Sequence, residues 1–158
     1  MKGKVVAFFL GGLLGLPAGA FLWYAFSPLL FDEVVSETLA EAEIISIGSF
    51  RDADRAHKGT GQATLVGLPG GTFEVQLSAF EVTNGPDLEV WLSAHPDPAS
   101  SADVADNAWV SLGQLKGNVG DQAYAVPAGT ELSLYKSVVI WCEQFGVLFS
   151  PAALAPAS

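Results

Sequence analysis

Cysteine and histidine are scarce in this sequence: among 158 residues there is one cysteine, Cys142, and there are two histidines, His57 and His95. A single cysteine excludes a disulfide within the chain. Three such residues are too few for a structural zinc site of four Cys and His ligands, so we expect no metal site. The Cys-x-x-Cys-His motif is missing, so any heme would be bound non-covalently. Gly-x-Ser-x-Gly is also missing, which leaves hydrolase chemistry without support.

Basic residues are few as well, with seven Lys and Arg against 17 Asp and Glu. All the acidic residues follow Phe31, whereas only five basic residues do so: Arg51, Arg55, Lys58, Lys116 and Lys136. So acidic a surface repels phosphate backbones, which excludes nucleic acid as a partner.

The N-terminal part of the chain is rich in apolar residues. No charged residue occurs from Val5 to Phe31, a run longer than the roughly 20 residues that a helix needs to cross a bilayer. Two lysines precede this run and acidic residues follow it, so the positive-inside rule keeps residues 1–4 in the cytoplasm. We therefore predict a single-pass transmembrane anchor at residues 5–31, with the rest of the protein outside the cytoplasm, in a periplasm or at the cell surface.

A cleaved signal peptide is the competing interpretation of this segment. Ala18-Gly19-Ala20 resembles a cleavage site with small residues at its two key positions. The sequence stays apolar through Trp23 and Tyr24, however, as in an anchor that ends in an interfacial aromatic belt. The composition thus favours the anchor.

Glycines recur at every fourth position within the predicted anchor, at Gly11, Gly15 and Gly19. They share one face of a helix and would let a second helix approach closely, which predicts a dimer face. Glycine is also common in membrane helices without such a role. Both interpretations stay open.

Residues 32–43 are acidic, with scattered apolar side chains. This pattern is typical of a short helical or disordered stalk. We expect the stalk to act as a spacer, because its charge repels anionic lipid headgroups.

From residue 44 to residue 158 the chain has short runs of branched and aromatic residues separated by glycine and proline. This predicts one all-β domain, a sandwich or small closed barrel of about eight strands. The expected strands are residues 44–50, 61–68, 72–83, 87–94, 108–115, 122–126, 137–143 and 146–149.

The period of two in a strand predicts which side chains enter the core. Val138, Ile140 and Cys142 share an apolar face, and Trp141 lies on the opposite one. In the longest run the apolar positions change phase after Leu77, which requires a bulge near Ala79. By itself, apolar burial would make Cys142 an inert thiol of the core.

Several segments, in order, resemble the DM-thirteen domain, the electron-transfer domain of Skeletor-type surface proteins. The resemblance covers about residues 44–154 and is carried by Gly48-Ser49-Phe50, by residues 57–63, 85–93, 120–127 and 137–149, and by Ala152-Ala153-Leu154. It implies a β-sandwich or barrel at a cell surface. It also implies redox chemistry at the family's cysteine, here Cys142, as a bare thiol or as a ligand to a cofactor such as heme.

The other candidate residues follow from this resemblance. His57 lies in the opening motif and could assist a heme bound at Cys142, although an ordinary loop histidine bonded to the backbone is the favoured interpretation. Trp141 is most simply a core or partner-contact residue, but it could also line the pocket of a cofactor. The chain has only an anchor and one domain, so a redox partner protein would have to supply or accept electrons. The alternative is a non-catalytic surface binding or adhesion module in which Cys142 only fills the core.

Overall fold

The computed structural model describes residues 15–17, 19–21, 23 and 31–157. Within these residues, no helix is long and apolar enough to cross a membrane. Most of the predicted anchor, residues 5–31, lies outside the described residues, as does Gly11 of the predicted dimer face. Gly15 and Gly19 are helical, and the dimer stays a prediction.

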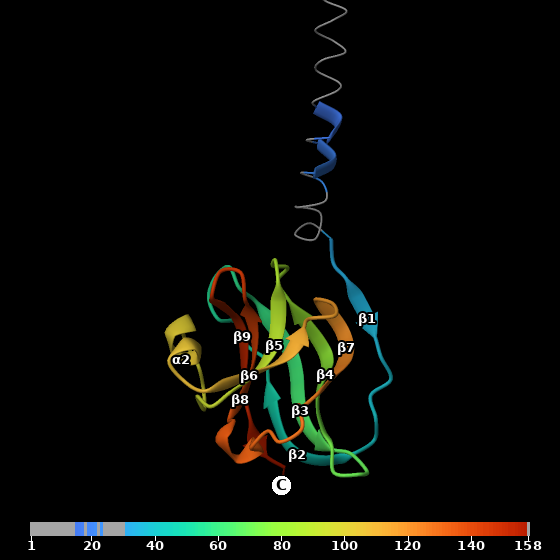
Figure 1. The fold of residues 1–158 in the computed structure, drawn as a ribbon, viewed down its shortest axis with the longest axis vertical. Helices are drawn as coiled ribbons and strands as arrows, with labels where there is room; N and C mark the ends of the chain where they lie inside the picture. The colour runs from blue at the N-terminus through green and yellow to red at the C-terminus, as the bar shows by residue number, and fades with distance from the viewer. Residues whose placement is uncertain (1–14, 18, 22, 24–30, 158) are drawn as a thin grey trace, which may run out of the picture.

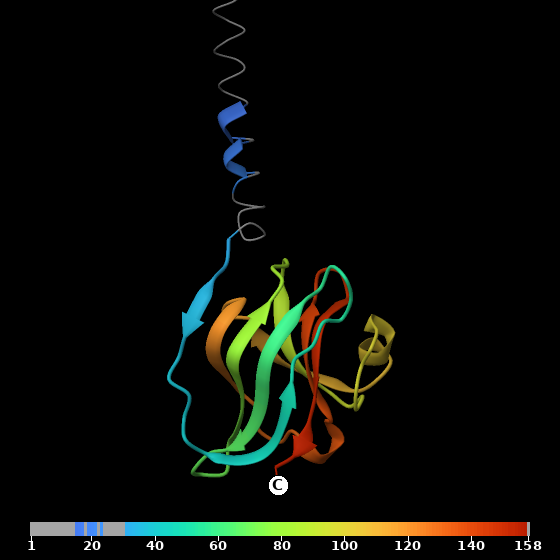
Figure 2. The ribbon, with the colours of Figure 1, turned by 180° about the vertical axis from the view of Figure 1, so that it is seen from behind.

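The described part of the chain forms ten strands in two sheets, seen from opposite sides in Figures 1 and 2. The six-stranded sheet has, in spatial order, β1 (Val34–Ser36), β7 (Val119–Ala125), β4 (Phe73–Val82), β3 (Gly59–Gly67), β2 (Glu43–Ser49) and β10 (Ala155–Pro156). The four-stranded sheet has β6 (Trp109–Gln114), β5 (Leu88–Ser93), β8 (Ser137–Cys142) and β9 (Val147–Ala153). Helix α2 (Ser101–Ala105) and the 3-10 helix η2 (Leu132–Leu134) complete the domain.

The all-β prediction is confirmed, and each of the eight expected strands is present. The sheets do not close on each other, so the sandwich is correct and the closed barrel is wrong. Two short strands, β1 and β10, add one edge each to the six-stranded sheet.

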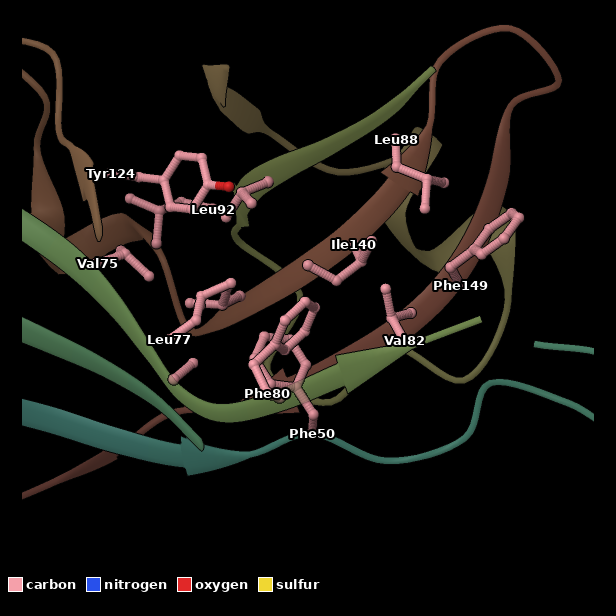
Figure 3. Packing of buried hydrophobic residues seen from close by; sticks show 14 of the residues in the cluster. Phe50, Val75, Leu77, Phe80, Val82, Leu88, Leu92, Tyr124, Ile140 and Phe149 are labelled. Atoms are coloured by element: carbon pink, nitrogen blue, oxygen red, sulfur yellow. The ribbon is translucent and has the colours of Figure 1, made fainter. Parts of the chain in front are cut away.

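The core lies between the sheets and follows the predicted alternation (Figure 3). Val138, Ile140 and Cys142 of β8 belong to this cluster, packed with aromatic side chains such as Phe80 and Phe149. Trp141 belongs to a separate cluster on the outer face of the four-stranded sheet. Burial on both faces explains why every residue of β8 is buried.

The bulge predicted near Ala79 is present in β4. The register with β7 shifts between Leu77 and Glu81, and Ala79 has a positive φ of 46°. This irregularity turns Phe80 and Val82 into the core after Leu77.

Residues 32–43, expected to be helical or disordered, instead contain β1, which pairs in parallel with β7. Polar side chains fix this segment to the domain. The backbone N–H of Glu33 donates to the side-chain oxygen of Asn118 at 2.7 Å, and the Lys116 ammonium lies 2.8 Å from the Glu37 carboxylate. Val34–Ser36 is therefore an edge strand of the sandwich.

Candidate functional site

Cys142 is the last residue of β8, just before the turn that leads to β9. The side chain is fully buried in the core between the sheets. Its Sγ donates a hydrogen bond to the backbone carbonyl of Pro86 at 3.0 Å. This contact uses the one hydrogen that the thiol can donate.

A short connection between β4 and β5 covers the thiol. We refer to Gly85, Pro86 and Asp87 as the cover loop. Asp87 has a positive φ of 54° and its carbonyl accepts a hydrogen bond from the Glu143 N–H at 3.0 Å. A Cβ at Gly85 would lie 2.6 Å from the Phe149 ring, so only glycine fits there without displacing that ring. The cover loop is thus packed tightly against the turn and the core.

Two surface hollows, of about 410 and 580 Å³, share Asn84, which directly precedes the cover loop. Gly85, Asp87 and Leu88 line the larger one. Leu88 is also the strand partner of Cys142 in the β5–β8 register. The thiol itself lines neither hollow, although Leu88 and two cover-loop residues line the larger one.

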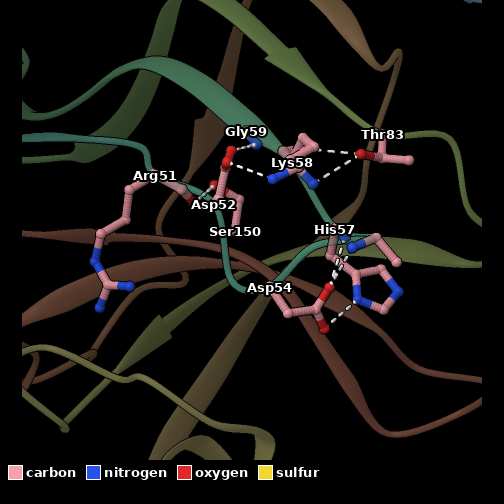
Figure 4. A network of polar contacts seen from close by, with 9 residues as sticks. Arg51, Asp52, Asp54, His57, Lys58, Gly59, Thr83 and Ser150 are labelled. Atoms are coloured by element: carbon pink, nitrogen blue, oxygen red, sulfur yellow. Dashed lines mark hydrogen bonds and ion pairs between the residues drawn. The ribbon is translucent and has the colours of Figure 1, made fainter.

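His57 has its own polar partners, which Figure 4 shows. Its Nδ1 lies 2.7 Å from the Asp54 carboxylate, and its ring packs on Phe149 with centroids 4.2 Å apart. The hydrogen bond from His57 lowers the pKa of Asp54 to about 2. Close by, Lys58 pairs with Asp52 at 2.8 Å.

Trp141 points away from Cys142, because neighbouring residues of a strand face opposite sides. It stacks on Trp91 with ring centroids 5.1 Å apart, and Trp91 stacks on Trp109 at 3.9 Å. We refer to Trp109, Trp91 and Trp141 as the tryptophan stack. The structure therefore places the predicted site residues Cys142, His57 and Trp141 in three different surroundings.

A heme does not fit at Cys142 in this arrangement. The thiol is fully buried, it is bonded to the Pro86 carbonyl, and apolar core side chains fill the space around it. Among the described residues, no group of three or more His, Cys, Asp and Glu side chains could hold a metal ion. The chemistry available at Cys142 is that of the thiol itself.

The model of the electron transfer DM13 family matches residues 49–154, which include the whole cover loop, Cys142 and the tryptophan stack. The chain belongs to this family. The resemblance noted in the sequence is thereby confirmed, and the description of the family as an electron-transfer domain supports a redox role for the β-sandwich. No curated protein and no solved structure matches the chain.

The tryptophan stack is the feature of this DM-thirteen domain that the sequence did not indicate. From the sequence alone, its three members are most simply core or partner-contact residues. Alternation places Trp91 and Glu89 on one face of β5, but nothing in the sequence shows that β6 pairs with β5 and brings Trp109 beside Trp91. The stack could not be predicted because the sequence does not show which strands pair.

Proposed function

We propose that this chain is an electron-transfer domain held outside the cytoplasm by an N-terminal membrane anchor, with Cys142 as its redox-active group. The observation that carries the proposal is the family match across residues 49–154, in which Cys142 is the only thiol. Its electrons come from, or go to, a separate redox partner protein, since the described residues offer no metal cluster.

The surroundings of Cys142 favour a thiol mechanism over cofactor ligation. Oxidation of the thiol removes its proton as well as an electron, and the Pro86 carbonyl accepts only a hydrogen bond. The proton must leave to water, so the cover loop has to move before the thiol can turn over. The thiol is thus protected at rest and available on opening.

The anchor in this proposal is supported by sequence alone, from the uncharged run at residues 5–31 and the lysines before it. A C-terminal fusion to a phosphatase that folds only outside the cytoplasm tests it. Activity of the fusion in membranes supports the anchor. Release of an active soluble form beginning near Phe21 would instead support signal-peptide cleavage.

Alkylation of Cys142 in the native chain tests whether the thiol can be reached. We expect a small alkylating reagent to label Cys142 faster than the domain unfolds globally, through local opening of the cover loop. In Gly85→Ala the new Cβ displaces the Phe149 ring, so labelling should become faster.

Gly67→Ala is the matched control for this experiment, because its Cβ would make only ordinary contacts at 3.7 Å or more. The labelling rate of Cys142 in this control should equal the rate in the native chain. If native labelling occurs only at the global unfolding rate, and Gly85→Ala changes nothing beyond its effect on stability, the redox role of the thiol is wrong.

A surface binding or adhesion module is the second candidate function. The observation in its favour is the complete burial of Cys142, which a core-filling residue would also have. A thiol that never reacts in the folded state would leave this candidate as the better account of the domain.

A further inference from the structure

The outer face of the four-stranded sheet carries an uninterrupted aromatic stack from solvent to a buried position. Trp109 is 46% exposed, whereas Trp91 and Trp141 are 3% and 4% exposed. The two ring pairs have interplanar angles of 13° and 28°, so both are stacked. Indole is among the most easily oxidised side chains, and stacked rings are well coupled for the passage of an electron.

The middle member of the stack has a proton acceptor in place. Trp91 Nε1 donates to the Glu89 carboxylate at 2.7 Å, and the Ser111 hydroxyl donates to the same oxygen at 2.6 Å. Both contacts are partly buried, and they hold the carboxylate against the indole N–H. An oxidised indole is a far stronger acid than neutral indole, so Glu89 is positioned to take its proton.

The far end of the stack lies next to the thiol along the chain. Trp141 is the strand partner of Glu89 across the β5–β8 register, and the next residue of β8 is Cys142. Burial of the cysteine therefore does not isolate it, because one peptide unit joins it to an aromatic path that ends at the surface.

We propose that the tryptophan stack is a one-electron relay between a redox partner at Trp109 and the β8 strand that bears Cys142. This inference rests on the proposed electron-transfer function and adds the route and the docking point. A one-electron oxidant of the partner takes one electron from Trp109 and leaves its radical cation. Trp91 returns that electron to Trp109 while its Nε1 proton moves to the Glu89 carboxylate.

The products of this step are neutral Trp109, a neutral Trp91 radical and a protonated Glu89. In the next step Trp141 gives one electron to the Trp91 radical and Glu89 returns the proton to Nε1. Trp91 and Glu89 are then restored, and the radical cation resides on Trp141, beside Cys142. A partner that donates one electron at Trp109 reverses the sequence.

Flash oxidation of the full-length chain in detergent, with photogenerated tris(bipyridine)ruthenium(III) as the oxidant, tests this relay. Transient absorption distinguishes the neutral indole radical from the radical cation. We expect the native chain to form the neutral radical. Trp91→Phe keeps a stacked ring and should abolish it, Glu89→Gln should leave only the radical cation, and Trp109→Phe should remove most of the radical yield.

Trp23→Phe removes the tryptophan outside the family match and is the matched control, with an expected native response. Thermal melting of each variant checks that the domain is folded. A neutral radical that persists in Trp91→Phe, or a yield that is unchanged in Trp109→Phe, overturns the relay.

Cys142→Ala separates the relay from the proposed role of the thiol. The relay predicts that the Trp91 radical still forms in this variant. A native radical response together with an unreactive thiol would keep the relay and remove the thiol function. Loss of the Trp91 radical together with a reactive thiol would keep the thiol function and remove the relay.

Discussion

The bond from the Cys142 thiol to the Pro86 carbonyl determines what this side chain contributes to stability. The site has two requirements: an apolar group that fills the core, as a small sulfur atom does, and a donor for the partly buried Pro86 carbonyl. Both requirements are met by cysteine, and substitutions that meet only one of them should show which matters more.

We expect Cys142→Ser to destabilise the domain less than Cys142→Ala does. Serine keeps a donor for the Pro86 carbonyl, whereas alanine leaves that carbonyl unpaired and removes the sulfur's packing, at a cost of about 1–3 kcal/mol. Urea denaturation of the two variants and the native chain measures the difference. The reverse order would mean that the Pro86 contact contributes nothing.

For individual residues, the sequence predicts which face of the sheet a side chain takes but not which residues it contacts. The period of two places Cys142 inward and Trp141 outward, and both assignments are confirmed. With no partner in view, serine would be predicted as the more harmful substitution at Cys142, because its hydroxyl would be buried unpaired. Pro86 is 56 positions away in the chain, and only the pairing of β5 with β8 brings it to the thiol.

Among the elements, β1 depends on two glycines, one within β7 and one just before it. A Cβ at Gly120 would overlap the Val35 carbonyl, and a Cβ at Gly117 would overlap that of Glu33. The parallel edge strand can lie this close to β7 only because those positions lack side chains. Glu37 adds to this attachment through Lys116 and by accepting a hydrogen bond from the Ala123 N–H.

Gly120→Ala should therefore release β1 from the sheet. Hydrogen exchange of the Glu37 N–H, which donates to the Asp121 carbonyl, should become much faster. Gly113→Ala is the matched control, since Gly113 also has a positive φ but a Cβ there meets nothing within 4 Å. The control should lose some stability and keep β1 protected; equal exchange in both variants would contradict this account.

The sequence predicts the eight long strands because each carries an alternating or continuous apolar run between turn residues. β1 is different: its three residues are too few to show a period, and the acidic residues around it are typical of a stalk. Its strand conformation comes from contacts with β7, which local sequence does not encode.

Across the whole molecule, acidic groups are held in their charged form by specific hydrogen bonds. The pKa of Glu37 is lowered by Lys116, that of Asp52 by Lys58 and that of Asp54 by His57. Backbone N–H groups at the start of α2 lower the pKa of Asp103. In each case the folded pKa lies below the unfolded one.

The stability of the domain should consequently fall in acid. Groups with lowered folded pKa values stabilise the fold above their unfolded values, near pH 4, and this contribution is lost as the pH falls through the folded values, about 2 for Asp54. Urea denaturation from about pH 6 to pH 2 should show the decline. Glu37→Gln should make it less steep, and a flat profile in the native chain would be inconsistent with these pairs.

For the whole domain, the sequence indicates an all-β fold of the electron transfer DM13 family, because the motifs of that family are present along residues 49–154. The absence of room for heme at Cys142 and the course of the tryptophan stack depend on how the sheets pack, which no single stretch of sequence determines.

Coulometric titration of the full-length chain in the presence of redox mediators tests the central claim most directly, because it counts electrons exchanged by the folded protein. The native chain should show a reversible electron exchange that is missing in Cys142→Ser, a variant that keeps the donor to Pro86. An identical electron count in the two proteins, or oxidation of Cys142 only after unfolding, would contradict the account.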